Sequence, residues 1–179
     1  MPNVFFIGDT HFTHKKIFTF EPEARKFNSV EEHDETLIER WNSVVTKNDT
    51  VWHLGDVLFS GHSFPLLARL NGKKKLVLGN HDAAFPVARF AEYFGTIVAS
   101  TKFDGTILSH IPIHPDQFYR WKANIHGHLH SKVVLVSSHN LADIRYVNVS
   151  AEQNNLTPIS YEDLKKKHPI LQQEFKRNT

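Results

Sequence analysis

The residues of this 179-residue chain that could do chemistry are histidines, aspartates and an asparagine that follow short apolar stretches. The clearest case is the stretch 76–82, in which Leu-Val-Leu is followed by Gly-Asn-His-Asp. The apolar residues predict a buried strand, and the polar groups after it would be costly to bury without partners. We therefore expect Asn80 and His81 to emerge at the end of this strand, where they could bind a metal ion and donate a proton to an oxyanion.

The same design recurs in four other places along the chain. Predicted strands end in Asp9 and His11, in Asp56, in His110, and in His128 and His130. Ligand sites in open α/β sheets lie beyond the carboxyl ends of the strands, so these side chains and Asn80 are expected to converge in one pocket. The chain has thirteen histidines. Many could simply be surface residues, but those at the strand ends suit neutral imidazole ligation.

The seven candidate ligands combine carboxylate, amide and imidazole groups. The chain has no cysteine, which excludes thiolate ligands and disulfides. This chemistry favours Mn²⁺, Fe or Zn²⁺ over Ca²⁺ or Mg²⁺. Seven ligands are too many for one such ion, but they fit two ions that share a bridging carboxylate. Two metals about 3.5–4 Å apart form a known clamp for in-line attack on phosphate esters, and they lower the pKa of bound water.

The elements that must position these groups are strands that alternate with helices early and gather late. Ser29 and Glu32 form a capping box ahead of apolar residues at helical spacing up to Val45, which predicts an amphipathic helix. We also expect strands over 4–8, 50–54, 96–99, 133–136 and 145–149, with a hairpin at 104–105. Further helices are expected over 63–72 (a short one), over about 83–94, and from 160. This order indicates an α/β sandwich of two sheets with outer helices, in one domain over residues 1–179.

Composition limits the function classes. A formal net charge of +2, from 21 Lys+Arg and 19 Asp+Glu, does not by itself indicate a nucleic-acid binder. The N-terminus does not resemble a signal peptide, and no stretch approaches the length of a membrane span. We expect a cytoplasmic protein with no membrane partner.

Two groups of residues could contact a nucleic acid or nucleoside. The lysines at 73–75 could meet a nucleic-acid backbone or form a solvated edge before a strand, and Phe118, Tyr119 and Trp121 could stack on a nucleoside or pack behind the site.

The ordered motifs Asp-x-His, Gly-Asp, Gly-Asn-His-Asp, His and Gly-His-x-His resemble those of the calcineurin-like metallophosphoesterases. They span residues 9–130, and Asp-Thr-His-Phe-Thr-His and Trp-His-Leu-Gly-Asp look like a small, compact bacterial and phage branch of that family. The resemblance implies a four-layer α/β/β/α sandwich of two mixed β-sheets flanked by helices. Many relatives follow Gly-Asp-x-x with a further Asp or Gly-Gly. Here Val57, Leu58 and Phe59 follow instead, which weighs against a close likeness to the phosphoprotein-phosphatase branch.

The resemblance also implies a role for each motif residue. The first metal would be bound by Asp9, His11, Asp56 and His130, and the second by Asp56, Asn80, His110 and His128, with Asp56 bridging. His81 would face the substrate and stabilise the phosphoryl oxygens or protonate the leaving group, and Asp82 would orient it. Asn80 and His14 are further candidates for substrate contact. We expect His53 to pack beside the site, and His33, His139 and His168 to lie at the surface.

These assignments predict a metal-dependent phosphoric ester hydrolase with two divalent ions. Mn²⁺ is the expected metal, with Fe, Zn²⁺ or Ni²⁺ as alternatives. The expected reaction is hydrolysis of phosphodiester bonds, nucleotide-type bonds included, by in-line attack of a metal-bridging hydroxide on a small phosphate ester or nucleotide. The alternatives are a phosphomonoesterase or a small nuclease of the same fold, with nucleic acid as a partner, and a non-catalytic scaffold. A scaffold would be expected to have lost ligands, whereas every motif position is filled here. The oligomeric state stays open.

Overall fold

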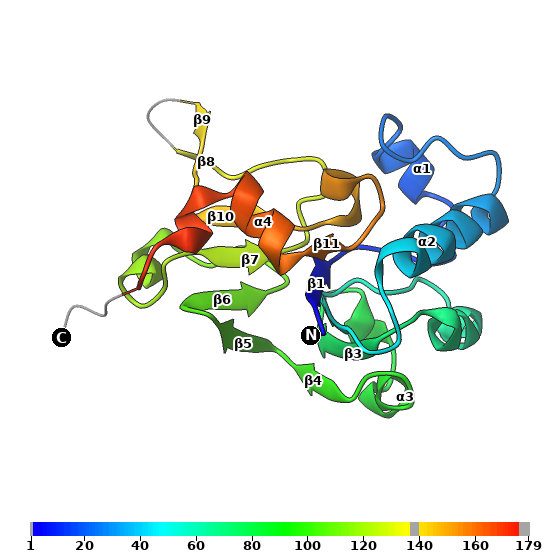
Figure 1. The fold of residues 1–179 in the computed structure, drawn as a ribbon. Coiled ribbons are helices and arrows are strands. Elements are labelled where there is room, and N and C mark those ends of the chain that lie inside the picture. Colours follow the sequence, from blue (N-terminus) through cyan, green and yellow to red (C-terminus); the bar gives the residue numbers. More distant parts are fainter. Residues whose placement is uncertain (1, 137–139, 176–179) are drawn as a thin grey trace.

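The computed structural model describes residues 2–136 and 140–175, and its main strands form two sheets (Figure 1). The first sheet has the order β11-β1-β2-β3-β4. Its strands are β1 (Val4–Ile7), β2 (Thr50–His53), β3 (Lys73–Val77), β4 (Thr96–Val98) and β11 (Ile159–Ser160). Strands β1 to β4 are parallel, and β11 is antiparallel to β1. The carboxyl ends of β1, β2 and β3 therefore meet at one edge of the sheet.

The second sheet has the order β10-β7-β6-β5. Its strands are β5 (Ser100–Phe103), β6 (Thr106–Ser109), β7 (Asn124–His126) and β10 (Tyr146–Asn148). β6, β7 and β10 are parallel, and β5 is antiparallel to β6. The predicted hairpin joins β5 to β6. Its two central residues, Asp104 and Gly105, have φ angles of 42° and 71°, as a tight two-residue turn requires.

The predicted strand over 133–136 differs in the structure. Only β8 (Leu135–Val136) forms there, and it pairs with β9 (Leu141–Ala142) in a small ladder outside both main sheets. The chain passes from the first sheet to the second at residue 99, between β4 and β5. The two sheets are thus joined directly, and loops from both can contribute to one site.

The helices are α1 (Ile17–Phe20), α2 (Val30–Val44), α3 (Val87–Ala91) and α4 (Tyr161–Lys167). Short 3₁₀ helices cover Gly61–Arg69, Asp82–Ala84, Pro115–Tyr119, Ala151–Asn154 and Pro169–Gln172. No helix in the described part of the chain combines the length and the apolar character that crossing a membrane requires.

Among the helices, local signals predicted α2 correctly but did not predict the bounds of α3. Ser29 Oγ accepts from the backbone N–H of Glu32, as expected at the start of α2, whereas the Glu32 carboxylate accepts from the N–H of Asn28. The helix expected over about 83–94 forms only in part. The chain makes a 3₁₀ turn and then α3, with a break at Pro86, because proline has no N–H and restricts the residue before it. The short α1 was not predicted.

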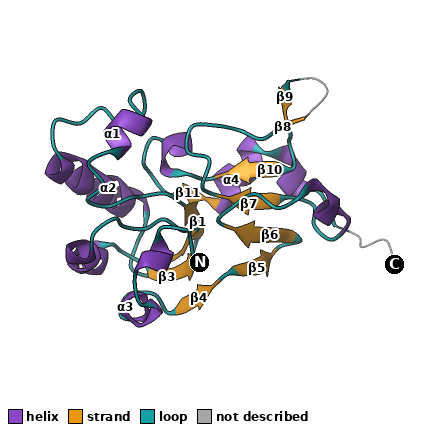
Figure 2. Cartoon of the chain, turned by 180° about the vertical axis from the view of Figure 1, so that it is seen from behind, coloured by secondary structure: helices purple, strands orange, loops and turns teal. Residues whose placement is uncertain are grey.

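Alternating side chains of the first sheet divide the interior into two cores. On one face, Phe5 and Leu76 pack with residues of α2 and α3. On the other face, Phe6 and Val77 pack with Leu108 and other residues of the second sheet. Figures 1 and 2 show α2 and α3 on the side of the first sheet that faces away from the second sheet. Two mixed sheets flanked by helices form the α/β/β/α arrangement that the sequence predicts.

The lysine run lies within a strand rather than before one. Residues 73–75 are part of β3, which is paired on both sides. Lys74 Nζ donates to the carbonyl of Leu70 at 2.8 Å, and Lys75 Nζ lies 5.1 Å from the ring centroid of Trp52. The stems of Lys74 and Lys75 pack along the sheet while their ammonium groups reach polar or aromatic partners. The predicted place of the run before the strand is therefore wrong, although Lys73 itself is exposed.

Stability should depend most on the core between the sheets. Leu108 is fully buried there, whereas Leu135 of β8 is 48% exposed. We expect Leu108→Ala to lower the free energy of unfolding by about 2–5 kcal/mol, because it removes packed atoms and leaves a cavity. Leu135→Ala, the matched control, should cost less than about 1 kcal/mol. Urea titration of both variants measures this. Equal losses would contradict the assignment of the core.

Candidate metal centre

Six of the seven predicted ligands gather in two groups at the carboxyl ends of the strands. The groups are Asp9, His11 and His130, and Asp56, His110 and His128. Within each group, one ligand atom of every residue lies within 4.8 Å of the others. Each group combines residues that follow strands of the first sheet with residues that follow strands of the second sheet. The structure therefore brings the strand ends together as the sequence predicted.

The second group is centred on the ring of His110. Its Nε2 lies 3.3 Å from Asp56 Oδ2, 2.9 Å from Asn80 Oδ1 and 3.2 Å from His128 Nδ1. Its Nδ1 lies 2.7 Å from the carbonyl of Leu54, which accepts a hydrogen bond from the Nδ1–H. The neutral ring then has its lone pair on Nε2, the usual arrangement for a metal-binding histidine. Asn80, the seventh predicted ligand, thus joins this group.

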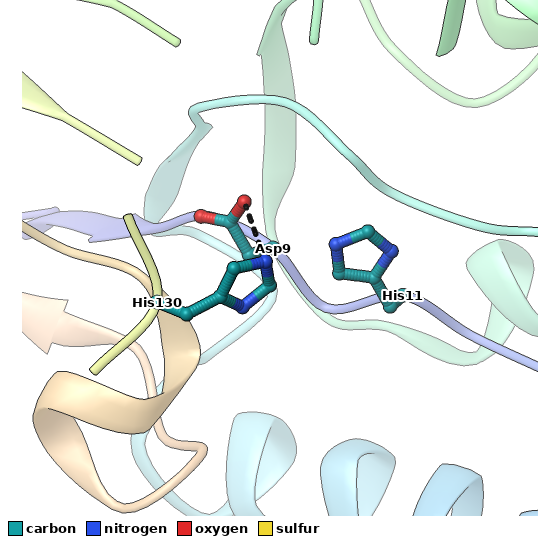
Figure 3. Close-up of side chains that lie close together, drawn as sticks. All are labelled: Asp9, His11 and His130. Atoms are coloured by element: carbon teal, nitrogen blue, oxygen red, sulfur yellow. Dashed lines mark ion pairs between the residues drawn. The ribbon is translucent and has the colours of Figure 1, made fainter. Parts of the chain in front are cut away.

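The first group is shown in Figure 3, in which the Asp9 carboxylate and the His130 ring point toward one another with the His11 ring beside them. Asp9 Oδ1 lies 4.0 Å from His130 Nε2. His11 Nε2 lies 3.7 Å from Asp56 Oδ2, so the Asp56 carboxylate is close to both groups. Both ring nitrogens of His11 are buried and have no hydrogen-bond partner among the described residues. Such orphaned groups are rare unless they bind an ion or water, and the donor set fits a divalent ion.

The backbone of the ligand loops adopts a conformation that non-glycine residues rarely take. Positive φ angles occur at Asp9 (55°), His11 (49°), Asp56 (54°), His128 (71°) and His130 (52°). Each such residue costs on the order of 1–3 kcal/mol and persists only where its surroundings hold it. The loops hold one another in part, since the N–H of Asp9 donates to the carbonyl of Gly55 at 2.9 Å and the N–H of His11 to that of Asp56 at 3.1 Å.

Two glycines allow the loops to approach the carboxylates closely. A Cβ atom at Gly79 would overlap the Asp56 carboxylate, and one at Gly127 would lie 2.5 Å from Asp9 Oδ2. The backbone amides beside these glycines bind the same carboxylates. His81 N–H donates to Asp56 Oδ1 at 2.9 Å, and His128 N–H donates to Asp9 Oδ2 at 2.9 Å. Both carboxylates are thereby fixed in orientation.

The carboxylate of Asp82 makes hydrogen bonds that were not predicted. We expected it to orient the ring of His81, but its carboxylate accepts backbone N–H groups of Asp56 at 3.0 Å, Val57 at 2.9 Å and Gly79 at 2.8 Å. The fully buried carboxylate thus ties the loop after β2 to the loop after β3. The side chain of His81 is 44% exposed, and its Nε2 lies 3.9 Å from Asp56 Oδ2. His81 therefore lies at the open side of the site.

Three buried residues that sequence reasoning missed support the first group. His130 Nδ1 lies 2.9 Å from Glu152 Oε1, which also accepts from Arg25 Nε at 2.7 Å. Arg25 is 1% exposed, and it donates to the backbone carbonyls of Asp9 and Thr10. Arg25 thus holds the strained loop after β1, and Glu152 holds the ring of His130.

His33 is the third missed residue, and its predicted place at the surface is wrong. It is fully buried, with Nε2 2.7 Å from Arg25 Nη1 and Nδ1 2.9 Å from Asp34 Oδ1. One signal could have found it, because His33 is spaced four and eight residues before the core residues Leu37 and Trp41 on α2. No comparable pattern marks Arg25, and Glu152 lies in a 3₁₀ turn.

Charges in the site follow from burial and from close pairing. Burial alone would raise the pKa of Asp56, but the hydrogen bond and charge of His110 outweigh it and lower the pKa to about 2. Burial alone would lower the pKa of His110, but the hydrogen bond to Asp56 and the charge of Asp9 raise it to about 9. Burial raises the pKa of Asp9 to about 6 and lowers that of His11 well below its usual value.

A cleft of about 630 Å³ opens over the candidate ligands. It is lined in part by His11, His81, His128 and His130. His14, a predicted substrate contact, is buried in its wall, with its ring stacked on Phe59 at a centroid distance of 3.7 Å. Burial lowers the pKa of His14 to about 4, so the ring is neutral.

Two further histidines with a predicted place, His53 and His168, belong to the described residues. His53 packs inside the fold, as expected, with Nε2 2.9 Å from Thr10 Oγ1. His168 is half-buried rather than exposed, and His139 lies outside the described residues.

Metal binding should release a proton and depend on pH. Because His110 Nδ1 donates to Leu54, its extra proton below pH about 9 is on Nε2, the nitrogen that would bind the ion. We expect the apparent affinity for Mn²⁺ to rise about tenfold per pH unit between pH 7 and 8.5, with release of about one proton. Calorimetry of chelator-treated protein in buffers of different ionisation enthalpy measures the Mn²⁺ affinity and the number of protons released. An affinity independent of pH, without proton release, would contradict this protonation state.

Glu152 should act on metal affinity through His130. Glu152→Gln keeps the size of the side chain but removes the charge that orients the imidazole, and loss of such a partner costs about 10–100-fold in metal affinity. We expect that loss at one of the two sites. Glu35→Gln, at an exposed pair with Arg69, is the matched control and should bind metal normally. Calorimetry gives the affinities and thermal melting checks folding. A folded Glu152→Gln variant with normal affinity at both sites would refute the role.

The chain is similar to a known family, to two proteins in other organisms and to a solved structure. The family model for calcineurin-like phosphoesterases matches residues 2–176. The gene 66 protein of Mycobacterium phage L5 is 31% identical over 170 residues, which cover 75% of this chain and 81% of that protein. An uncharacterized protein of Methanocaldococcus jannaschii is 35% identical over 167 residues, covering 89% and 88%. A solved structure, of a protein of unknown function from Aquifex aeolicus, matches with a TM-score of 0.74 and 26% identity over 93% of this chain and 100% of that one.

Proposed function

This chain belongs to the calcineurin-like phosphoesterase family, and we propose that it is a binuclear metal-dependent phosphodiesterase. The observation that carries the proposal is the position of the Asp56 carboxylate. Its Oδ2 lies 3.3 Å from His110 Nε2 in one ligand group and 3.7 Å from His11 Nε2 at the other. A carboxylate so placed can bridge two ions, and a pair of ions is the arrangement suited to in-line displacement at phosphorus.

The proposed ligands divide into two sets that share Asp56. The first set is Asp9, His11, Asp56 and His130, and the second is Asp56, Asn80, His110 and His128. Ligands of mixed oxygen and imidazole type without sulfur favour Mn²⁺, with Fe, Zn²⁺ or Ni²⁺ as alternatives. Two divalent ions held there would supply positive charge to the phosphoryl oxygens and lower the pKa of a water molecule.

The residues of the chain would position the ester and move the proton. His81 reaches into the cleft from the open side, so its ring can donate to a phosphoryl oxygen or to the oxygen of the leaving group. Asn80 points its Oδ1 toward His110, which leaves its amide N–H₂ to donate to the substrate. Asp82 would act as a positioning residue, because it fixes the loops that carry Asp56 and Asn80.

The cleft also bears on the class of ester. It is open and has room for both alcohol groups of a diester, and we therefore propose diesters over monoesters.

Two substitutions should separate metal binding from proton transfer. Asp56→Ala should abolish turnover of bis(p-nitrophenyl) phosphate and reduce the metal content, because it removes the shared ligand. His81→Gln should lower kcat by about 10²–10⁴-fold, the usual contribution of a general acid, and leave both ions bound. Elemental analysis alongside the assay, with Mn²⁺ and with chelator, measures both quantities. Loss of metal in His81→Gln would show that His81 is a ligand, and faster turnover of the p-nitrophenyl monoester would make the protein a phosphatase.

A further inference from the structure

Two phenylalanine rings are exposed in the cleft beside the candidate ligands. Phe59 is 46% exposed and Phe20 is 64% exposed, and both line the cleft. Neither is part of the two hydrophobic cores of the described chain. A large aromatic ring gains most from burial, so two rings left open at one site indicate a surface that a ligand covers.

Phe59 is held rigidly although its ring is open. It follows Val57 and Leu58, which are both fully buried, and its backbone N–H donates to the carbonyl of Phe12 at 2.9 Å. Its ring stacks on the neutral ring of His14, with 7° between the planes. With one face stacked on His14 and 46% of the residue exposed, Phe59 still offers part of its ring to a ligand. The ring centroid lies 5.6 Å from that of His81, next to the position at which the ester would react.

The rest of the cleft wall has the chemistry that accepts a charged, planar ligand. Phe20, at the end of α1, lies 6.1 Å from His14 between ring centroids and extends the aromatic surface. Lys16 and Lys132 line the same cleft and outnumber its one acidic lining residue, Glu21, so the lysines and the acid together leave an excess of positive charge. Aromatic rings beside basic groups are the combination that binds stacked bases and their phosphates. The cleft volume of about 630 Å³ is that of a small-molecule pocket.

We propose that the substrate is a small nucleotide diester whose base stacks on Phe59, with Phe20 as the outer wall. This inference rests on the proposed phosphodiesterase function. In the reaction, the oxygen of water bonds to phosphorus, the ester P–O bond breaks, and the released alcohol oxygen takes a proton. The aromatic residues suggested by the sequence are elsewhere. Phe118 packs on Tyr146, and the exposed Tyr119 is outside the cleft.

The experiment compares two diesters with the same leaving group, thymidine 5′-(p-nitrophenyl phosphate) and methyl p-nitrophenyl phosphate, on the Mn²⁺-loaded protein. We expect the thymidine ester to have a kcat/KM at least about tenfold higher, the scale of one stacked base. Phe59→Leu should remove most of this preference, mainly through KM, and Phe59→Trp should restore it. Tyr119→Leu, which removes an aromatic ring that is 64% exposed outside the cleft, should leave both rates unchanged.

A second measurement does not depend on turnover. Saturation-transfer NMR of thymidine 5′-monophosphate with the chelator-treated protein should show strong transfer to the base proton H6. The signal should weaken in Phe59→Leu and persist in Tyr119→Leu.

Three results would overturn the inference while the phosphodiesterase proposal stands. The first is equal rates for the two esters, and the second is an equal loss of both rates in Phe59→Leu. The third is a much higher kcat/KM for an oligothymidylate than for the thymidine ester, with the steep salt dependence of nucleic-acid binding. No hydrolysis of either ester by protein that holds two ions would overturn the phosphodiesterase proposal instead. The NMR measurement would then decide on its own whether the cleft binds a nucleotide.

Discussion

The carboxylate of Asp56 constrains the rest of this site, because it lies between two groups of candidate ligands that come from different loops. Its position follows from several independent restraints. The backbone of Asp56 has a positive φ, its Oδ1 accepts from the N–H of His81, and Asp82 binds its backbone N–H. Gly79 leaves the space that the carboxylate occupies. These restraints come from residues after both β2 and β3.

The strained ligand loops depend on a buried charge network behind them. Arg25 binds the carbonyls of Asp9 and Thr10 on one side and the Glu152 carboxylate on the other. Desolvating such a pair is expensive, and it is retained only where further hydrogen bonds satisfy its members. Here His130 and His33 provide those bonds. The network therefore offsets part of the backbone strain and gives His130 one orientation.

Local signals in the sequence predicted those parts of the molecule whose causes are local. A short apolar run that ends in a polar group predicted β1, β2, β6 and β7, and Ser29 predicted the start of α2. The convergence of the ligands followed from the general geometry of parallel strands. Predictions failed where distant residues decide. The partners of Asp82 lie in three backbone segments, and nothing near Arg25 in sequence indicates Glu152, 127 positions away. Pro86 is the exception, since the break it causes was readable from the sequence.

Each ligand group draws residues from both sheets, and this has a mechanical consequence for the whole fold. Asp9, His11 and Asp56 follow strands of the first sheet, whereas His110, His128 and His130 follow strands of the second. Packing between the sheets is apolar and has no direction of its own. An ion bound by either group would act as a cross-link at one end of that interface and keep the layers from sliding. Metal binding would then also stiffen the sandwich, and amide protons deep in β6 and β7 would exchange more slowly when an ion is bound.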